Sequence, residues 1–199
     1  MAGGLRNSLL LVGIGAIVII VGAVMISRDP ASGAGAVSGN KNMSSTLTLN
    51  TSAFENGQAI PSEYTCDGDN VSPLLAIAGV PEGAKSLALI MDDPDVPTQL
   101  KPDGVFDHWT LFNIAPETRE IPENGSAGTV GANGSGQSAY TGPCPPAQYE
   151  PSEHRYFFRL YALDAELDIP AGASKKDVLA AMEGHIIDRA ELMGRYKRK

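Results

Sequence analysis

Short apolar runs alternate along most of the chain with breaks rich in Gly, Pro, Asn and Asp. The runs have the length of β-strands and are rich in aromatic and β-branched residues. Repeated runs of this length with this punctuation are typical of an antiparallel β-sandwich. We therefore predict a mainly β fold with strands within residues 47–51, 74–80, 86–93, 108–115 and 155–164.

A helical pattern follows near the end of the chain. Ser174 can cap a helix with Asp177 at its third position, and apolar residues then recur at helical spacing. These apolar residues are Val178, Leu179, Met182, Ile186 and Ile187. We predict a C-terminal helix from Ser174 to about Tyr196, as one of a few helices at the periphery of the sandwich.

The first residues of the chain predict a membrane segment. The 18 residues Leu9–Ile26 carry no charge, and as a helix they would span about 27 Å, close to the thickness of a hydrocarbon core. This run is longer than the apolar core of an ordinary signal peptide. We predict one transmembrane helix within residues 1–27 that anchors the protein. The alternative is a signal peptide that is cleaved at residues 34–36.

The rest of the chain divides into a linker and a domain. Residues 28–45 are small and polar and cannot bury a core, so we predict a flexible linker there. Residues 46–199 are numerous enough for one compact domain with its own core.

The net charge limits the choice of partners. The chain has 15 Lys and Arg residues against 23 Asp and Glu residues, a formal charge of −8. A negative field opposes contact with a nucleic-acid backbone, so we expect no nucleic-acid partner. The same field still allows a small anion to bind in a local pocket.

Sequence features place the domain outside the cytoplasm. Asn-X-Ser patterns, which are glycosylated only outside the cytoplasm, occur at Asn42, Asn50, Asn70, Asn124 and Asn133. Turn formation explains some of these patterns equally well, so glycosylation itself stays open. With the single N-terminal helix and the two cysteines, these patterns predict an extracytoplasmic domain on the cell membrane, or a secreted one if the N-terminal segment is cleaved.

Polar residues stand at the ends of several predicted strands. Asp93 and Asp95 follow an apolar run, His108 begins another, and His154 and Tyr156 share one face of the last. Because strand ends of a sandwich meet at its rims, these residues can converge on one site. Taken singly, a hydrogen-bonded, half-buried histidine and an Asp-Pro-Asp turn would explain them as well.

Two enzymatic alternatives use the same residues. Two histidines and two carboxylates resemble a divalent metal site, but they lack the short ligand spacing of zinc sites. A serine hydrolase would need a nucleophile elbow, and the chain has no Gly-X-Ser-X-Gly sequence. We expect a protein that is not an enzyme and needs no metal or cofactor. A weak hydrolase or metal enzyme that uses the His/Asp cluster stays an alternative.

Six segments, in order along the chain, carry a family resemblance. They are CDG at 66–68, DPDVP at 93–97, DHW at 107–109, GPCPP at 142–146, HRYFFRLYALD at 154–164 and EGHIIDRAELMGRY at 183–196. From about Leu47 to Tyr196 the chain resembles the phosphatidylethanolamine-binding protein family. The resemblance is closer to the bacterial and archaeal Raf kinase inhibitor-like branch. Residues 147–153 form a longer segment than is usual in the family.

The resemblance implies a β-sandwich with a small pocket for phosphate-like headgroups. By position in the motifs, its ligand-binding residues are Asp93, Asp95, His108, Gly142, His154 and Tyr156. A carboxylate that accepts from one histidine nitrogen favours the charged ring and leaves the other nitrogen to donate to an anion. Cys66 and Cys144 flank segments of this pocket, and the exterior is oxidising, so we expect them to form a disulfide.

The predicted function is therefore that of a membrane-tethered binding protein for a small anionic ligand, such as phosphate or a phospholipid headgroup. The resemblance also implies an alternative function, the inhibition of a serine protease. In that alternative an exposed loop at residues 125–140 or 148–153 would lie against the protease.

Overall fold

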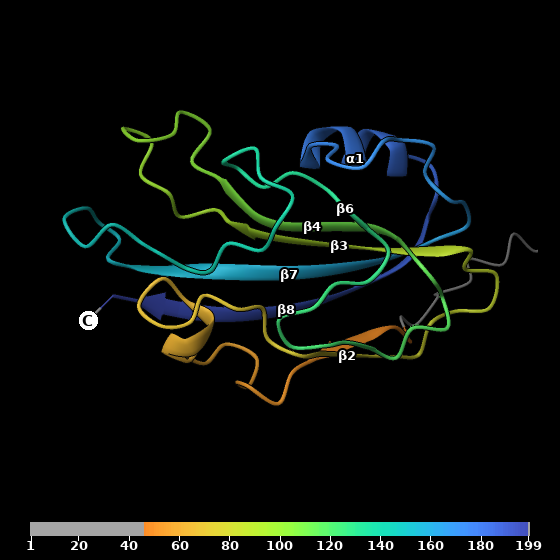
Figure 1. Ribbon diagram of the computed structural model, residues 1–199, viewed down its shortest axis with the longest axis horizontal. Helices are drawn as coiled ribbons and strands as arrows, with labels where there is room; N and C mark the ends of the chain where they lie inside the picture. Colours follow the sequence, from red (N-terminus) through yellow and green to blue (C-terminus); the bar gives the residue numbers. More distant parts are fainter. Residues whose placement is uncertain (1–45, 199) are drawn as a thin grey trace, which may run out of the picture. The chain divides into compact units, whose positions relative to one another are not determined.

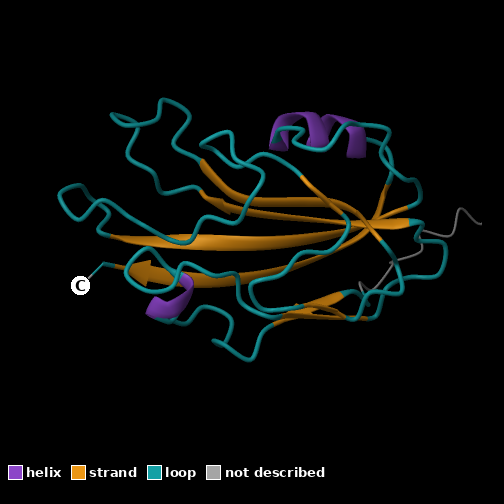
Figure 2. Cartoon of the chain, viewed as in Figure 1, coloured by secondary structure: helices purple, strands orange, loops and turns teal. Residues whose placement is uncertain are grey.

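The computed structural model describes residues 46–198, whose strands and connections are shown in Figures 1 and 2. The predicted anchor and linker fall outside the described residues. Within residues 46–198, none of the helices has the length and apolar character needed to cross a bilayer. The predicted mainly β architecture is confirmed, because strands and their loops make up most of this part of the chain (Figure 2).

Two antiparallel sheets form the described fold. The larger has the strand order β6-β4-β3-β7-β8 and the smaller has the order β1-β2-β5. The strands of the larger sheet are β3 (Ser86–Asp93), β4 (Phe106–Ile114), β6 (Thr129–Val130), β7 (Glu153–Leu163) and β8 (Ile186–Lys197). Those of the smaller sheet are β1 (Thr48–Asn50), β2 (Leu75–Ala78) and β5 (Glu120–Ile121). A short 3-10 helix, η1 (Ser62–Tyr64), follows β1.

The main core joins the two sheets. Leu49 and Ile77 of the smaller sheet belong to the same buried cluster as Leu89 and Phe158 of the larger sheet. Side chains alternate between the core and the solvent along β1, β2 and most of β7, as the two-residue period of a strand requires.

Strand β3 departs from this alternation, since all of its residues are buried. Its second face is covered by α1 (Lys175–Met182), where Ile90 shares an apolar cluster with Val178 and Met182. Figure 1 shows α1 beside β4, on the side of the larger sheet opposite β2. Cover on both faces explains why the sequence of β3 is a continuous apolar run.

The predicted C-terminal helix is wrong beyond residue 182. Helix α1 begins as predicted, with the Ser174 and Asp177 side chains each accepting from the other's backbone N–H. Gly184 then has a φ of 82°, a left-handed conformation that commonly ends helices. From Ile186 the chain forms β8, which pairs with β7 along its length. The buried residues of β8 have the period of a strand; they are Leu192, Gly194 and Tyr196.

Candidate functional site

A small cavity, which we call the rim cavity, lies where β3 ends and where β4 and β7 begin. The loops after β3 and before β7 extend past this same end of the larger sheet (Figure 1). The cavity holds about 160 Å³, which is the liquid volume of about five water molecules. Its polar lining includes Asp93, His108 and His154, and its apolar walls include Val96, Phe106, Pro145 and Pro146. Only a ligand with few heavy atoms fits such a volume.

His154 enters the cavity from the start of β7. Its ring is buried, and its Nδ1 donates to Oδ2 of Asp93, the last residue of β3, at 2.6 Å. The other oxygen of Asp93 accepts from the backbone N–H of Asp95 at 2.8 Å, which fixes the carboxylate. Burial lowers the pKa of His154, but the hydrogen bond and charge of Asp93 outweigh burial, so the net shift is upward. The site therefore favours the imidazolium form of His154.

A local irregularity in β4 directs His108 into the same cavity. The register of β3 against β4 shifts between Met91 and Asp92, which leaves His108 as an extra residue of β4. Such β-bulges redirect side chains near functional sites. The ring of His108 packs edge-on against Phe106 and Tyr156, with centroid distances of 4.8 Å and 5.2 Å.

The hydrogen bond of His108 differs from that of His154. Its Nδ1 donates to the backbone carbonyl of Thr141 at 2.6 Å. His108 is buried, with only 3% of its surface exposed. Burial lowers the pKa of His108, and the carbonyl and nearby carboxylates offset this effect only in part. The site therefore favours a neutral His108 with its proton on Nδ1.

Both histidines that line the rim cavity keep one ring nitrogen without a hydrogen bond. Within residues 46–198, Nε2 of His108 and Nε2 of His154 are buried and have no hydrogen-bond partner. A buried polar atom without a partner costs on the order of 1–3 kcal/mol, and folded proteins keep few of them. Because both residues line the rim cavity, a small polar ligand there is a candidate partner for these atoms.

The proline-rich segment forms one wall of the cavity. The N–H of Gly142 donates to Oδ1 of Asn70 at 2.8 Å, and a Cβ on Gly142 would lie 2.4 Å from the carbonyl oxygen of Tyr64. No larger residue fits there without a backbone shift. Cys144, which also lines the cavity, forms a disulfide with Cys66. These contacts tie the wall to η1 and to the turn that follows it.

Asp95 and Tyr156, which were predicted to bind ligand, do not line the cavity. Asp95 forms a two-point ion pair with Arg155, at 2.6 Å and 2.9 Å, and this bond lowers the pKa of Asp95. Tyr156 stands behind the two histidines, with ring centroids 5.2 Å from His108 and 6.4 Å from His154. Its hydroxyl is buried without a hydrogen-bond partner of normal geometry, and burial raises its pKa. Ligand binding by Asp95 and Tyr156 stays a prediction.

Several residues of the site were not identified from the sequence. Val96 and Phe106 supply apolar wall, and both lie within or beside recognised motifs, which could have indicated them. Thr141 acts through its backbone carbonyl, and Asn70 supports Gly142 across a gap of 72 residues. Side-chain chemistry gives no signal for a backbone acceptor or for a contact so distant in sequence.

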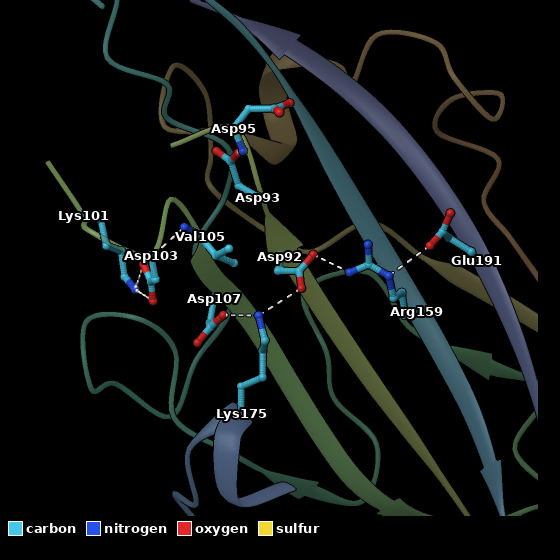
Figure 3. A network of polar contacts seen from close by, with 10 residues as sticks. All are labelled: Asp92, Asp93, Asp95, Lys101, Asp103, Val105, Asp107, Arg159, Lys175 and Glu191. Carbon is cyan, nitrogen blue, oxygen red and sulfur yellow. Dashed lines mark hydrogen bonds and ion pairs between the residues drawn. The ribbon is translucent and has the colours of Figure 1, made fainter. Parts of the chain in front are cut away.

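Ion pairs fix the outer face of the larger sheet behind the site (Figure 3). Lys175 of α1 contacts Asp107 at 2.6 Å and Asp92 at 3.0 Å. Arg159 of β7 contacts Asp92 at 2.5 Å and Glu191 of β8 at 2.9 Å. Lys175 therefore connects the helix to β3 and β4.

The rim cavity offers a ligand the ring nitrogens of His108 and His154 and the carboxylate of Asp93. Residues 46–198 contain no group of three or more His, Cys, Asp or Glu side chains placed to hold a metal ion. A charged donor within apolar walls favours a small anion, because charge-assisted hydrogen bonds are stronger where water is excluded.

Comparison with known proteins extends the sequence resemblance. The family model described as phosphatidylethanolamine-binding protein matches residues 50–197. A UPF0098 protein of Methanothermobacter thermautotrophicus is 52% identical over 159 residues, which cover 76% of this chain and 99% of that protein. A UPF0098 protein of Pyrococcus horikoshii is 39% identical over 203 residues, which cover 98% of each chain.

Solved structures share the fold. The crystal structure of a phosphatidylethanolamine-binding protein homolog from Chlamydia trachomatis aligns with a TM-score of 0.74 at 41% identity, over 78% of this chain and 100% of that one. YbcL of Escherichia coli, described as a member of the mammalian family, aligns with a TM-score of 0.69 at 27% identity, over 77% of this chain and 99% of its own. On the family match and these identities, the chain belongs to the phosphatidylethanolamine-binding protein family.

Proposed function

We propose that the domain is a binding protein for small phosphate-like anions, which it holds in the rim cavity. One observation carries this proposal: His154 lines the cavity, and its buried Nε2 forms no hydrogen bond of normal geometry within residues 46–198. Because Asp93 accepts a hydrogen bond from Nδ1–H and favours the charged ring, Nε2 carries a second N–H that can donate to an anion.

The binding is expected to be modest. A charge-assisted hydrogen bond contributes roughly 1.5–3 kcal/mol. Two such bonds, less the loss of ligand freedom, correspond to a dissociation constant in the micromolar to millimolar range. The Asp93 carboxylate also carries a negative charge, which limits the net attraction for an anion. Phosphate-like ligands should therefore exchange readily.

A larger hollow is a weaker candidate. It holds about 420 Å³ on the outer face of β7 and β8 and is lined in part by Arg159. That guanidinium already contacts Asp92 and Glu191, so its donors are largely used within the protein. Binding an anion there would compete with these ion pairs.

The proposal includes a tether outside the cytoplasm. It rests on the uncharged segment Leu9–Ile26, and a relative from Pyrococcus horikoshii aligns with nearly the whole chain, that segment included. The full chain should remain with membranes after an alkaline carbonate wash, and a variant without residues 1–27 should be released. Release of both proteins would remove the anchor from the proposal.

Proton NMR of the histidine rings tests anion binding. Millimolar inorganic phosphate should shift the ring resonances of His154 and His108, and His154→Ala should abolish the shift at His108. The matched control is His185→Ala, because His185 is exposed and, among the described residues, its ring pairs with Asp164. If phosphate leaves the rings of His108 and His154 unmoved in the unmodified protein, the proposed function is wrong.

Protease inhibition and weak hydrolysis stay predictions from the sequence. Residues 125–140 and 148–153 are the loops assigned to the first alternative. Slower cleavage by chymotrypsin-like or subtilisin-like proteases in the presence of the domain would support that alternative. Esterase assays test the second one.

A further inference from the structure

The two free nitrogens of the rim cavity are not equivalent. A backbone carbonyl only accepts hydrogen bonds, so the bond from Nδ1 of His108 to Thr141 places the proton of a neutral ring on Nδ1. Nε2 of this ring then carries a lone pair and accepts. The bond from His154 to Asp93 also holds a proton on Nδ1, but this ring is paired with a carboxylate and its Nε2 donates.

The surroundings of the two rings maintain this difference. His108 lies between the rings of Phe106 and Tyr156 and bonds to a neutral carbonyl, so a charge on it would lack a direct partner. The charged and titratable groups around it are Asp92 and Asp93 of β3, Asp107 of β4, and Tyr156 and His154 of β7. Those around His154 are Asp93, Asp95 and Tyr156. Within residues 46–198, the Nδ1 of His154 has a carboxylate as its hydrogen-bond partner, whereas the Nδ1 of His108 has a backbone carbonyl.

The rim cavity thus presents one fixed donor and one fixed acceptor within largely apolar walls. We propose that it selects phosphate monoesters in their singly protonated form, with the P–OH donating to Nε2 of His108 and a P–O⁻ accepting from Nε2 of His154. This inference rests on the proposed function and specifies its ligand. A phosphodiester or a carboxylate has only hydrogen-bond acceptors at physiological pH. One of its oxygens would then face Nε2 of His108, also an acceptor, and the two lone pairs would repel each other.

The protonation of the ligand makes binding depend on pH in a defined way. The second pKa of a phosphate monoester is about 6. At about pH 5 the free ligand already carries the required proton, so binding takes up none. At about pH 7.5 most of the free ligand is a dianion, and binding should take up about one proton per site.

Isothermal titration calorimetry in buffers of different ionisation enthalpy counts these protons. The ligands are methyl phosphate, its diester dimethyl phosphate, and acetate. At about pH 5, methyl phosphate should bind about tenfold or more tightly than dimethyl phosphate, because the diester leaves a buried acceptor without a donor. Glycerol 3-phosphate and a short-chain phosphatidic acid, which are both monoesters, separate a soluble ligand from a lipid headgroup; tight binding of either supports the proposal.

Substitution of the acceptor tests the assignment. His108→Gln supplies a side chain that can turn either an oxygen or an NH₂ toward the ligand, so the preference for the monoester should fall to about threefold or less. His185→Gln is the matched control and should keep the full preference. The proton count in the unmodified protein does not depend on how well these variants fold.

The outcomes separate the two proposals. Dimethyl phosphate that binds as tightly as methyl phosphate at about pH 5, or methyl phosphate that takes up no proton at about pH 7.5, would overturn the monoester assignment and leave anion binding intact. If no ligand binds at either pH, the proposed function fails together with this inference.

Discussion

At the scale of single residues, the pair of Asp93 and His154 makes stability depend on pH. The pKa of His154 is raised in the folded protein, because Asp93 outweighs the effect of burial. The stabilisation that comes from this shift in the pKa of His154 is therefore complete below the unfolded pKa of about 6.5. It is lost as the pH rises through the higher folded pKa. We expect His154→Gln to lower the free energy of unfolding more at about pH 5.5 than at about pH 9. Urea unfolding at the two pH values measures this difference.

His108 contributes in the opposite sense. Its folded pKa is lowered by burial, so it favours folding above about pH 6.5, and this contribution is lost as the pH falls toward the folded pKa. The loss caused by His108→Gln should therefore be smaller at about pH 5.5 than at about pH 9. If both substitutions show the same dependence on pH, the assignment of one charged and one neutral ring is wrong.

Motifs in the sequence identified much of the cavity but not its details. Asp93, His108, Gly142 and His154 line it, because strand ends and the proline-rich loop meet at one rim. Asp95 lies beside them in sequence, yet its carboxylate turns to Arg155, since two-point pairing with a guanidinium is available there. Spacing along the chain cannot say which nearby partner a side chain contacts.

At the scale of elements, Lys175 is the main polar link between α1 and the larger sheet. We expect Lys175→Ala to lower the free energy of unfolding by about 1–3 kcal/mol, because Asp107 and Asp92 both lose an ion pair with Lys175, while the pair of Asp92 with Arg159 remains. The matched control is Lys176→Ala on the exposed side of the same helix, with an expected change within about 0.5 kcal/mol. Chemical denaturation measures both. Equal losses would show that the network does not anchor the helix.

The elements that sequence patterns missed are those whose identity depends on distant partners. The segment that became β8 has apolar residues at spacings that fit a helix, but pairing with β7 satisfies its backbone along most of its length. Strands β5 and β6 have only two residues each and carry no period at all. The long strands β3 and β7 were predictable because each buries enough apolar residues to reveal its pattern.

At the scale of the whole molecule, the disulfide between Cys66 and Cys144 closes a separation of 78 residues. In the chain-entropy account, a loop of this size stabilises the fold by about 4–5 kcal/mol. The double variant Cys66→Ser, Cys144→Ser should lose most of this stability and should bind phosphate more weakly, because Cys144 belongs to the cavity wall. Denaturation with and without reductant measures the first effect. If reductant leaves the free energy of unfolding of the unmodified protein unchanged, the predicted stabilisation by the disulfide is wrong.

The overall charge of the chain and the local chemistry of the rim cavity have opposite effects on the binding of anions. The chain is acidic at −8, yet the rim cavity offers an imidazolium donor because Asp93 is committed to the inner nitrogen of His154. A general negative field discourages polyanions, whereas a short-range hydrogen bond within apolar walls still favours one small anion.

A crystal structure of the domain with methyl phosphate tests the central claim most directly. We predict density for the phosphoryl group in the rim cavity, with one oxygen about 2.7–2.9 Å from Nε2 of His154 and another within hydrogen-bond distance of Nε2 of His108. An empty cavity at a saturating concentration of methyl phosphate, or a phosphoryl group bound only on the outer face of β7 and β8, would contradict the account.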